Sequence, residues 1–115
     1  METIRSATPG DGARLVHLLE SAGLDDLARR ADVATCLDCG FLLVLDLGDS
    51  LGAAAYVALE SDSDQTHARL RFLAIHPALR DTDAADRIAI AVIAVCEASG
   101  CVDLDLDLDR SDSRR

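Results

Sequence analysis

The second half of the chain contains the stretch that decides the fold: Leu70-Arg71-Phe72-Leu73-Ala74-Ile75-His76-Pro77-Ala78-Leu79-Arg80. Its apolar residues predict a strand over 67–76, which stops at Pro77 because proline has no amide to donate. The segment 83–99 is apolar nearly all round, which predicts a helix that is covered on more than one side and ends at Gly100. Residues 101–109 alternate between apolar residues and aspartate, which predicts a last strand. This order of strand, crossover helix and strand predicts that the two strands are parallel neighbours.

The N-terminal half predicts the remaining elements. In chain order they are a strand at 3–7, a helix capped by Asp11 and ended by Gly23, a weaker helix at 25–36, and a hairpin of strands at 41–47 and 52–60. The polar segment 61–66 predicts a loop before the strand at 67–76. The chain is therefore expected to be an α/β protein with a mixed central sheet and the order β-α-α-β-β-β-α-β.

Length and hydropathy bound the class of protein. The chain has 115 residues, of which 50% are hydrophobic, enough for one packed domain over 1–109 with a polar tail at 110–115. The N-terminus has no basic segment followed by an apolar one, so no secretory signal is expected. The longest apolar run, residues 88–96, is well short of the ~18 residues of a membrane span. We expect a cytoplasmic protein.

The charge is strongly negative. The sequence has 21 acidic residues against 11 basic ones, a net charge of -10, and all the basic residues are arginine. Such a surface repels phosphate backbones and anionic lipids. Binding to nucleic acid or to a membrane surface is therefore not expected.

Two segments resemble the GNAT family of acetyl-CoA-dependent N-acetyltransferases. Residues 4–11 are similar to the family's first strand and turn, and residues 70–80 are similar to its fourth strand and the approach to its cofactor loop. The resemblance covers residues 3–109 in order, and within the family the chain looks closest to small members found beside arsenic-resistance genes. It implies the acyl-CoA N-acyltransferase fold, truncated after the fifth strand. The implied activity is acetyl transfer from acetyl-CoA to an amine of a small molecule.

The resemblance also implies where acetyl-CoA binds. The pantetheine arm would enter a V-shaped opening between the fourth and fifth strands and pair with the backbone of Leu73, Ala74 and Ile75. A backbone N–H there would polarise the thioester carbonyl. The pyrophosphate would lie at the N-terminus of the following helix. The family's loop, Arg/Gln-x-x-Gly-x-Gly/Ala, corresponds here to Arg80, Asp81, Thr82, Asp83, Ala84 and Ala85.

Asp83 departs from this pattern, because it replaces the central glycine. Glycine can adopt a positive φ that costs other residues about 1–2 kcal/mol, although aspartate tolerates it better than most. The carboxylate matters more, since about 4 Å from a phosphate it is repelled by about 4 kcal/mol at an effective dielectric near 20. The alternative function is therefore a non-catalytic domain of the same fold that binds a partner or dimerises and has lost coenzyme A binding.

The chemistry of acetyl transfer needs a proton acceptor for the amine. Glu60 and His76 could each take this proton through a water molecule, although no motif places either of them. In the family a tyrosine beyond the fifth strand often serves as the acid. The only tyrosine, Tyr56, lies in the predicted third strand and does not match that position.

Cysteines and aspartates form two further patterns. Cys36 and Cys39 have the spacing of half a zinc site, which Cys96 and Cys101 could complete, but buried cysteines used as small apolar residues explain them more simply. The carboxylates of the last strand share one face and fit a cation site, a binding site for an amine or a basic partner, or a solvated edge that a second subunit could also cover: Asp103, Asp105, Asp107 and Asp109. We favour free thiols, no metal and a solvated edge, with a homodimer as the alternative.

Overall fold

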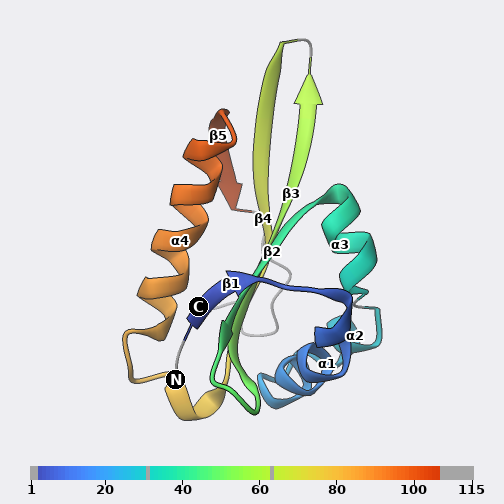
Figure 1. Cartoon of the computed structure of the whole chain (residues 1–115), viewed down its shortest axis with the longest axis vertical. Coiled ribbons are helices and arrows are strands. Elements are labelled where there is room, and N and C mark those ends of the chain that lie inside the picture. Colours follow the sequence, from blue (N-terminus) through green and yellow to red (C-terminus); the bar gives the residue numbers. More distant parts are fainter. Residues whose placement is uncertain (1–2, 31, 63, 107–115) are drawn as a thin grey trace.

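The computed structural model describes residues 3–30, 32–62 and 64–106 of the chain (Figure 1). Its strands and α-helices follow the predicted order, with one additional helix: β1 (Thr3–Ser6), α1 (Gly12–Ser21), α2 (Asp25–Arg30), α3 (Val33–Cys39), β2 (Gly40–Asp46), β3 (Leu51–Asp62), β4 (Gln65–Ile75), α4 (Ala84–Ala98) and β5 (Cys101–Leu106). Short 3-10 turns precede α1 and α4, at Pro9–Asp11 and Pro77–Leu79.

The five strands form one mixed sheet with the spatial order β1-β2-β3-β4-β5. The pairs β1–β2, β2–β3 and β3–β4 are antiparallel, whereas β4 and β5 are parallel. The parallel pair confirms the prediction from the order of strand, helix and strand. Helices α1, α2 and α3 lie on one side of the sheet and α4 on the other (Figure 1). The fold is therefore an α/β sandwich of three layers.

Each face of the sheet has its own core. The α1 face is packed with Leu15, Leu18 and Leu19, which meet β2 and β3, and the α4 face is packed around Ile88 and Val92. At the centre, β3 contributes an alanine run, 53–55, that is completely buried. These small side chains let helices approach the sheet closely on both faces.

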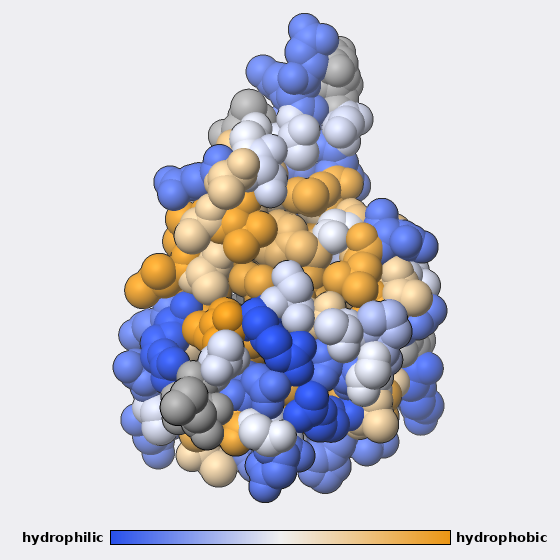
Figure 2. All heavy atoms as spheres, viewed as in Figure 1, coloured by the Kyte–Doolittle hydropathy of each residue, from blue (hydrophilic) through white to orange (hydrophobic). Residues whose placement is uncertain are grey.

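The predicted loop at 61–66 is wrong. Strand β3 continues to Asp62, and β4 begins at Gln65, so the two strands form one long hairpin. The hairpin extends beyond the helices, and its tip is polar (Figures 1 and 2). Polar residues form strands here because each strand satisfies the backbone groups of the other, up to the pair Asp62 and Gln65.

The single helix predicted at 25–36 is also wrong, because the structure has two short helices. Helix α2 ends at Arg30, and α3 starts at Val33. Between them Asp32 adopts an extended conformation, and its carboxylate accepts a hydrogen bond from the Ala34 amide at 3.3 Å. Asp32 is therefore the N-cap of a new helix, a role in which aspartate is favoured.

Helix α4 is covered on one side only, so the expectation of cover on several sides is wrong. Ile88 and Val92 are buried against the sheet, whereas Ile90 and Ile93 are 67% and 50% exposed. Apolar side chains gather across the middle of the face seen in Figure 2, between the polar hairpin tip and the polar lower end. None of the helices among the described residues has the length and hydropathy needed to cross a membrane.

Candidate functional site

The candidate site lies at the end of β4, past its last described pair with β5. The parallel register runs from Thr66 and Cys101 to Leu70 and Leu106, whereas β4 itself continues to Ile75. The backbone of Leu73 to Ile75 therefore lies past the last pair that the structure describes on this edge. A strand edge of this kind offers backbone donors and acceptors to an extended ligand.

A β-bulge marks the start of this segment. Tyr56 pairs with Phe72 and Val57 pairs with Leu70, so Arg71 is an additional residue in β4. Two residues apart in a regular strand share a face. Because of the bulge, Leu70 instead packs on the α4 face and Phe72 on the α1 face. The alternation of apolar and polar residues in the sequence did not reveal that the side chains change faces at this point.

The segment after β4 leads to the N-terminus of α4 through short-range hydrogen bonds. The ring Nδ1 of His76 accepts a hydrogen bond from the Ala78 amide at 3.1 Å. The Thr82 hydroxyl donates to the carbonyl of Leu79 at 2.7 Å and accepts from the Ala84 amide at 3.2 Å. The first amide of α4 is thus already satisfied by Thr82. By helix geometry the next two amides have no acceptor one turn back.

Asp83, the residue in place of the expected glycine, has an ordinary backbone conformation. Its φ is -85° and its ψ is 12°, so no left-handed residue is needed here and the aspartate causes no strain. Its side chain makes no capping hydrogen bond to the helix. The consequence of Asp83 is therefore electrostatic.

The charges around the start of α4 have both signs. Asp81, Asp83 and Asp86 are exposed, as is Arg80, while Arg87 is half-buried. The helix dipole and Arg80 favour an anion at this position, whereas the three carboxylates oppose it. The residues expected for the cofactor loop are thus brought together in space, but with a net negative charge.

The structure does not bring Glu60 to this site. Glu60 pairs with His67 in the projecting part of the hairpin, and its carboxylate lies 3.7 Å from the Arg69 guanidinium. The six residue-to-residue steps from His67 to Leu73 span about 20 Å at the usual rise of a strand. His76, in contrast, directly follows β4 and lies beside the candidate loop.

Tyr56, which the sequence places in the third strand, lies beside the bulge, where it pairs with Phe72. Its ring lies 5.8 Å from that of Phe72, between centroids. Burial first, and then the nearby thiols of Cys36 and Cys39, raise the pKa of Tyr56 to about 12. The phenol is therefore protonated at neutral pH and can donate a hydrogen bond. Only the tertiary contacts reveal this, because the sequence places Tyr56 in a strand without showing its neighbours.

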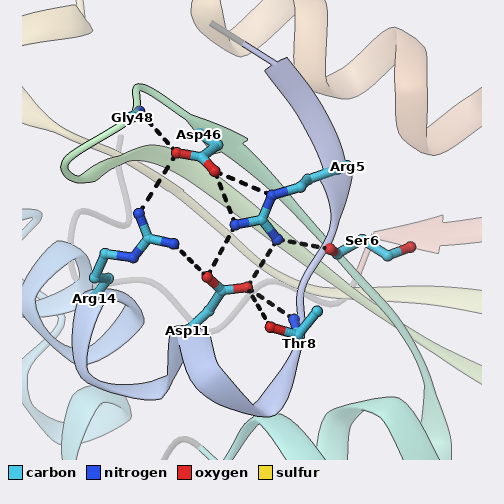
Figure 3. A network of polar contacts seen from close by, with 7 residues as sticks. All are labelled: Arg5, Ser6, Thr8, Asp11, Arg14, Asp46 and Gly48. Atoms are coloured by element: carbon cyan, nitrogen blue, oxygen red, sulfur yellow. Dashed lines mark hydrogen bonds and ion pairs between the residues drawn. The ribbon is translucent and has the colours of Figure 1, made fainter. Parts of the chain in front are cut away.

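A second polar cluster joins β1, the start of α1 and the end of β2 (Figure 3). The Asp11 carboxylate is 2% exposed and accepts hydrogen bonds from Arg5 at 2.9 and 3.0 Å, from Arg14 at 2.6 Å and from the Thr8 amide at 2.8 Å. Arg5 also donates to Asp46 at 2.9 and 3.1 Å. The hydrogen bonds from Arg5 hold the pKa of Asp11 well below its usual range.

This cluster corrects the prediction that Asp11 caps α1, and its role in the fold is structural. Asp11 stands at the N-cap position of α1, but its side chain makes no cap hydrogen bond to that helix, because Arg5 and Thr8 occupy the carboxylate. The charges inside the cluster already pair with one another. We therefore assign it a structural role.

The cysteines do not form one metal centre. Cys36 belongs to the core of the α1 face and Cys96 to that of the α4 face, so the sheet separates the two pairs and the four-thiolate zinc hypothesis is wrong. Among the described residues no three metal-ligating side chains gather at one place. On β5, Asp103 is exposed, and its carboxylate oxygen forms a hydrogen bond with Nδ1 of His67 at 2.9 Å. Asp107 and Asp109 lie outside the described residues, as does the predicted tail 110–115.

Comparison with known proteins identifies the fold. Neither the family models nor the curated proteins that were compared give a match to the sequence. Among solved structures, a transcriptional regulator from Bacillus halodurans has a TM-score of 0.75 at 20% identity, covering 100% of this chain and 85% of that one. A GNAT family acetyltransferase from Staphylococcus aureus has 0.75 at 16% identity, covering 99% and 95%.

A third structure adds a bound ligand. An aminoglycoside N-acetyltransferase in complex with CoA has a TM-score of 0.74 at 19% identity, covering 96% of this chain and 78% of that one. These identities are low, so the likeness concerns architecture. The chain has the GNAT fold, as the resemblance of residues 4–11 and 70–80 implied.

Proposed function

We propose that this chain, which has the fold of the GNAT acetyltransferases, transfers an acetyl group from acetyl-CoA to an amine of a small molecule. The observation that carries the proposal is the position of Leu73 to Ile75 at the end of β4, past its last described pair with β5 and directly before the loop that leads to α4. The backbone of a strand end and the N-terminus of a helix thus follow one another closely along the chain. One ligand with an amide-containing arm and a pyrophosphate matches both features.

The backbone of this chain fits such a ligand. Leu73, Ala74 and Ile75 would hold the pantetheine arm by backbone hydrogen bonds, and the loop from Arg80 to Ala85 would hold the pyrophosphate. Asp83 has a backbone conformation that any residue can adopt, so the loop does not need the positive φ that glycine allows. The opposing feature is its charge, which lowers affinity without changing the shape of the loop.

The reaction needs an activated acyl group, a place for negative charge and a donor for the leaving group. Acetyl-CoA, when bound, supplies the acetyl group as a thioester. A backbone N–H of the segment Leu73 to Ile75 would donate to the carbonyl oxygen as negative charge builds there. His76 accepts a hydrogen bond at Nδ1, so its neutral ring carries the proton on Nε2. We therefore assign His76 the role of hydrogen-bond donor to the leaving sulfur, and the thiolate takes up the proton that the amine loses.

Calorimetric titration with acetyl-CoA tests this proposal, using the wild-type chain, Asp83→Asn and the control Asp38→Asn. Asparagine keeps the size of Asp83 and is an equally good residue at a helix N-terminus. At about 4 Å the repulsion that it removes lies between about 1 kcal/mol in water and about 4 kcal/mol at a dielectric near 20. We expect at least about fivefold tighter binding in Asp83→Asn.

The control removes one charge far from the site, since Asp38 is an exposed residue of α3 on the other side of the sheet. Its affinity should equal that of the wild type. Equal affinities in all three proteins would show that phosphate does not approach Asp83. Absence of binding in all three at millimolar acetyl-CoA would refute the proposed function.

The exposed carboxylates at the start of α4 favour a second candidate, a domain that works by association. Asp81, Asp83 and Asp86 would then be retained because no phosphate binds there. In the described part of the sheet β5 is the edge strand, so a second copy could pair with it. Binding that appears only in Asp83→Asn, together with a dimer by analytical ultracentrifugation in the wild type, would favour this candidate.

A further inference from the structure

The turn between α4 and β5 brings two cysteines together. Gly100 follows the helix in a left-handed conformation, with a φ of 78°, and its amide donates to the carbonyl of Glu97 at 3.2 Å. This is the hydrogen bond of a Schellman-type helix end, which places the residue after the glycine against the last turn of the helix. Here the residue after the glycine is Cys101, and the helix residue that this motif places opposite it is Cys96, which belongs to the same apolar cluster.

The two thiols are neighbours. The side chains of Cys96 and Cys101 line one cavity between α4 and β5, and both are free thiols. Both belong to the packing on the α4 face of the sheet. A disulfide forms only between cysteines whose side chains converge in this way, and the local turn supplies that convergence without help from distant elements.

The same two thiols face a cavity. A cavity of about 250 Å³ lies between the end of α4 and the start of β5, and it is lined by Ile93, Cys96, Glu97, Cys101, Asp103 and Leu104. A water molecule occupies about 30 Å³, so a molecule of a few atoms can enter. Cys96 is only 6% exposed, but the cavity gives small reactants access to its sulfur.

We propose that Cys96 and Cys101 form a redox-active dithiol that hydrogen peroxide oxidises to an intramolecular disulfide. In the first step the sulfur of one cysteine, as thiolate, attacks a peroxide oxygen; the O–O bond breaks, and a sulfenic acid and hydroxide form, the hydroxide taking up the proton that the thiol released. In the second step the other sulfur attacks the first, the S–S bond forms, the S–O bond breaks and water leaves. The net reaction consumes two thiols and one peroxide and yields one disulfide and two water molecules.

Burial assigns the order of the two steps. Cys101 is half-buried and meets peroxide first, whereas Cys96 is the more enclosed thiol and resolves the sulfenic acid. Consistent with this order, burial and then the neighbouring Cys101 raise the pKa of Cys96 to about 11, so Cys96 is the poorer first nucleophile at neutral pH. The proposal concerns this turn alone and is independent of acetyl transfer.

The link would act on the parallel pair of strands. Cys101 is the first residue of β5 and pairs with Thr66 of β4. A disulfide to Cys96 would tie this end of β5 to α4 and leave the other end, where the candidate site lies, without a new constraint.

Peptide mapping tests the proposal on the intact chain. Arginine is the only basic residue that trypsin can use here, so residues 88–110 form one fragment with Cys96 and Cys101, and residues 31–69 form another with Cys36 and Cys39. The protein is treated with limiting hydrogen peroxide, its remaining thiols are alkylated, and it is digested with trypsin. The masses of the fragments are then measured by mass spectrometry. We expect fragment 88–110 to lose both thiols together, to lack two hydrogen atoms and to recover both thiols after reduction.

Two variants check the pairing. In Cys96→Ser we expect Cys101 to collect as sulfenic or sulfinic acid, and in Cys101→Ser we expect Cys96 to remain a thiol at the same peroxide concentration. Two results on the wild-type chain, which do not depend on the folding of a variant, would overturn the proposal. One is retention of both thiols in fragment 88–110 when Cys39 is already oxidised, and the other is Cys101 as sulfinic acid beside a reduced Cys96.

Discussion

Asp11 shows how one residue can connect three parts of the fold. A buried carboxylate is costly unless charged or polar donors surround it. Asp11 has Arg5 from β1, Arg14 from α1 and the amide of Thr8 as donors, and Arg5 continues to Asp46 at the end of β2 (Figure 3). The cluster therefore fixes the path of β1 into α1 against the sheet.

Replacing Asp11 tests this role. We expect Asp11→Asn to lower the free energy of unfolding at pH 7 by about 3 kcal/mol, because it leaves two arginines without their buried partner. Urea unfolding followed by circular dichroism measures the change. Asp38→Asn, at an exposed position of α3, is the control and should stay within about 0.5 kcal/mol of the wild type.

The same pair of proteins carries a pH prediction. The pKa of Asp11 is lowered in the folded state, by Arg5 first, so the folded protein favours the carboxylate. The stabilisation is complete above the ordinary aspartate pKa of about 3.9 and is lost as the pH falls below it. The difference in unfolding free energy between the wild type and Asp11→Asn should therefore shrink below about pH 4. A constant difference between pH 7 and pH 3 would contradict this account.

At the scale of elements, α4 has two sides that its sequence does not distinguish. Ile88 is completely buried, whereas Ile90 is 67% exposed. Sequence alone predicted a helix here because the run is apolar and ends at Gly100. It could not show which side is open, since the isoleucines on both sides are equally apolar, and only contact with the sheet separates them.

Truncating each isoleucine measures the difference. We expect Ile88→Ala to lower the free energy of unfolding by about 3 kcal/mol, through lost burial and the cavity left behind. Ile90→Ala should change it by less than about 0.5 kcal/mol, because little surface is buried there and alanine favours a helix. Urea unfolding of both variants checks this, and equal losses would show that the exposed side of α4 is covered in solution.

Other elements show why local rules were incomplete. The single helix predicted at 25–36 combined two because apolar spacing continues across the break, while Asp32 caps a new helix. The polar segment 61–66 read as a loop because composition cannot show that a second strand is present to pair with it. Both errors arise where backbone hydrogen bonding outweighs side-chain pattern.

For the whole molecule, the order of elements and the parallel pair were predictable, because a strand, helix and strand allow few arrangements. The site was predictable in part. Residues 70–80 located the end of β4 and the loop before α4, and the structure brings these together. The place of Glu60 and the neighbours of Tyr56 depend on tertiary contacts that no local pattern encodes, and the direction of the His76 hydrogen bond depends on the local turn at Pro77–Leu79.

The net charge of -10 has an effect on the whole fold. Like charges repel more strongly in a compact chain than in an unfolded one. Raising sodium chloride from about 10 mM to about 150 mM shortens the screening length from about 30 Å to about 8 Å. We expect the melting temperature to rise by a few degrees, with potassium chloride giving the same rise. A fall in melting temperature would mean that surface ion pairs outweigh the repulsion.

The bulge at Arg71 reverses the alternation of side chains between the two faces of β4. Before it, Ala68 and Leu70 point to the α4 face, and after it Phe72 and Ala74 point to the α1 face. A hydrophobicity pattern compared along this strand without a one-residue gap would therefore match one half and invert the other. The same offset means that deleting Arg71 would leave Leu70 and Phe72 as adjacent residues on opposite faces, which is a regular strand with both cores unchanged.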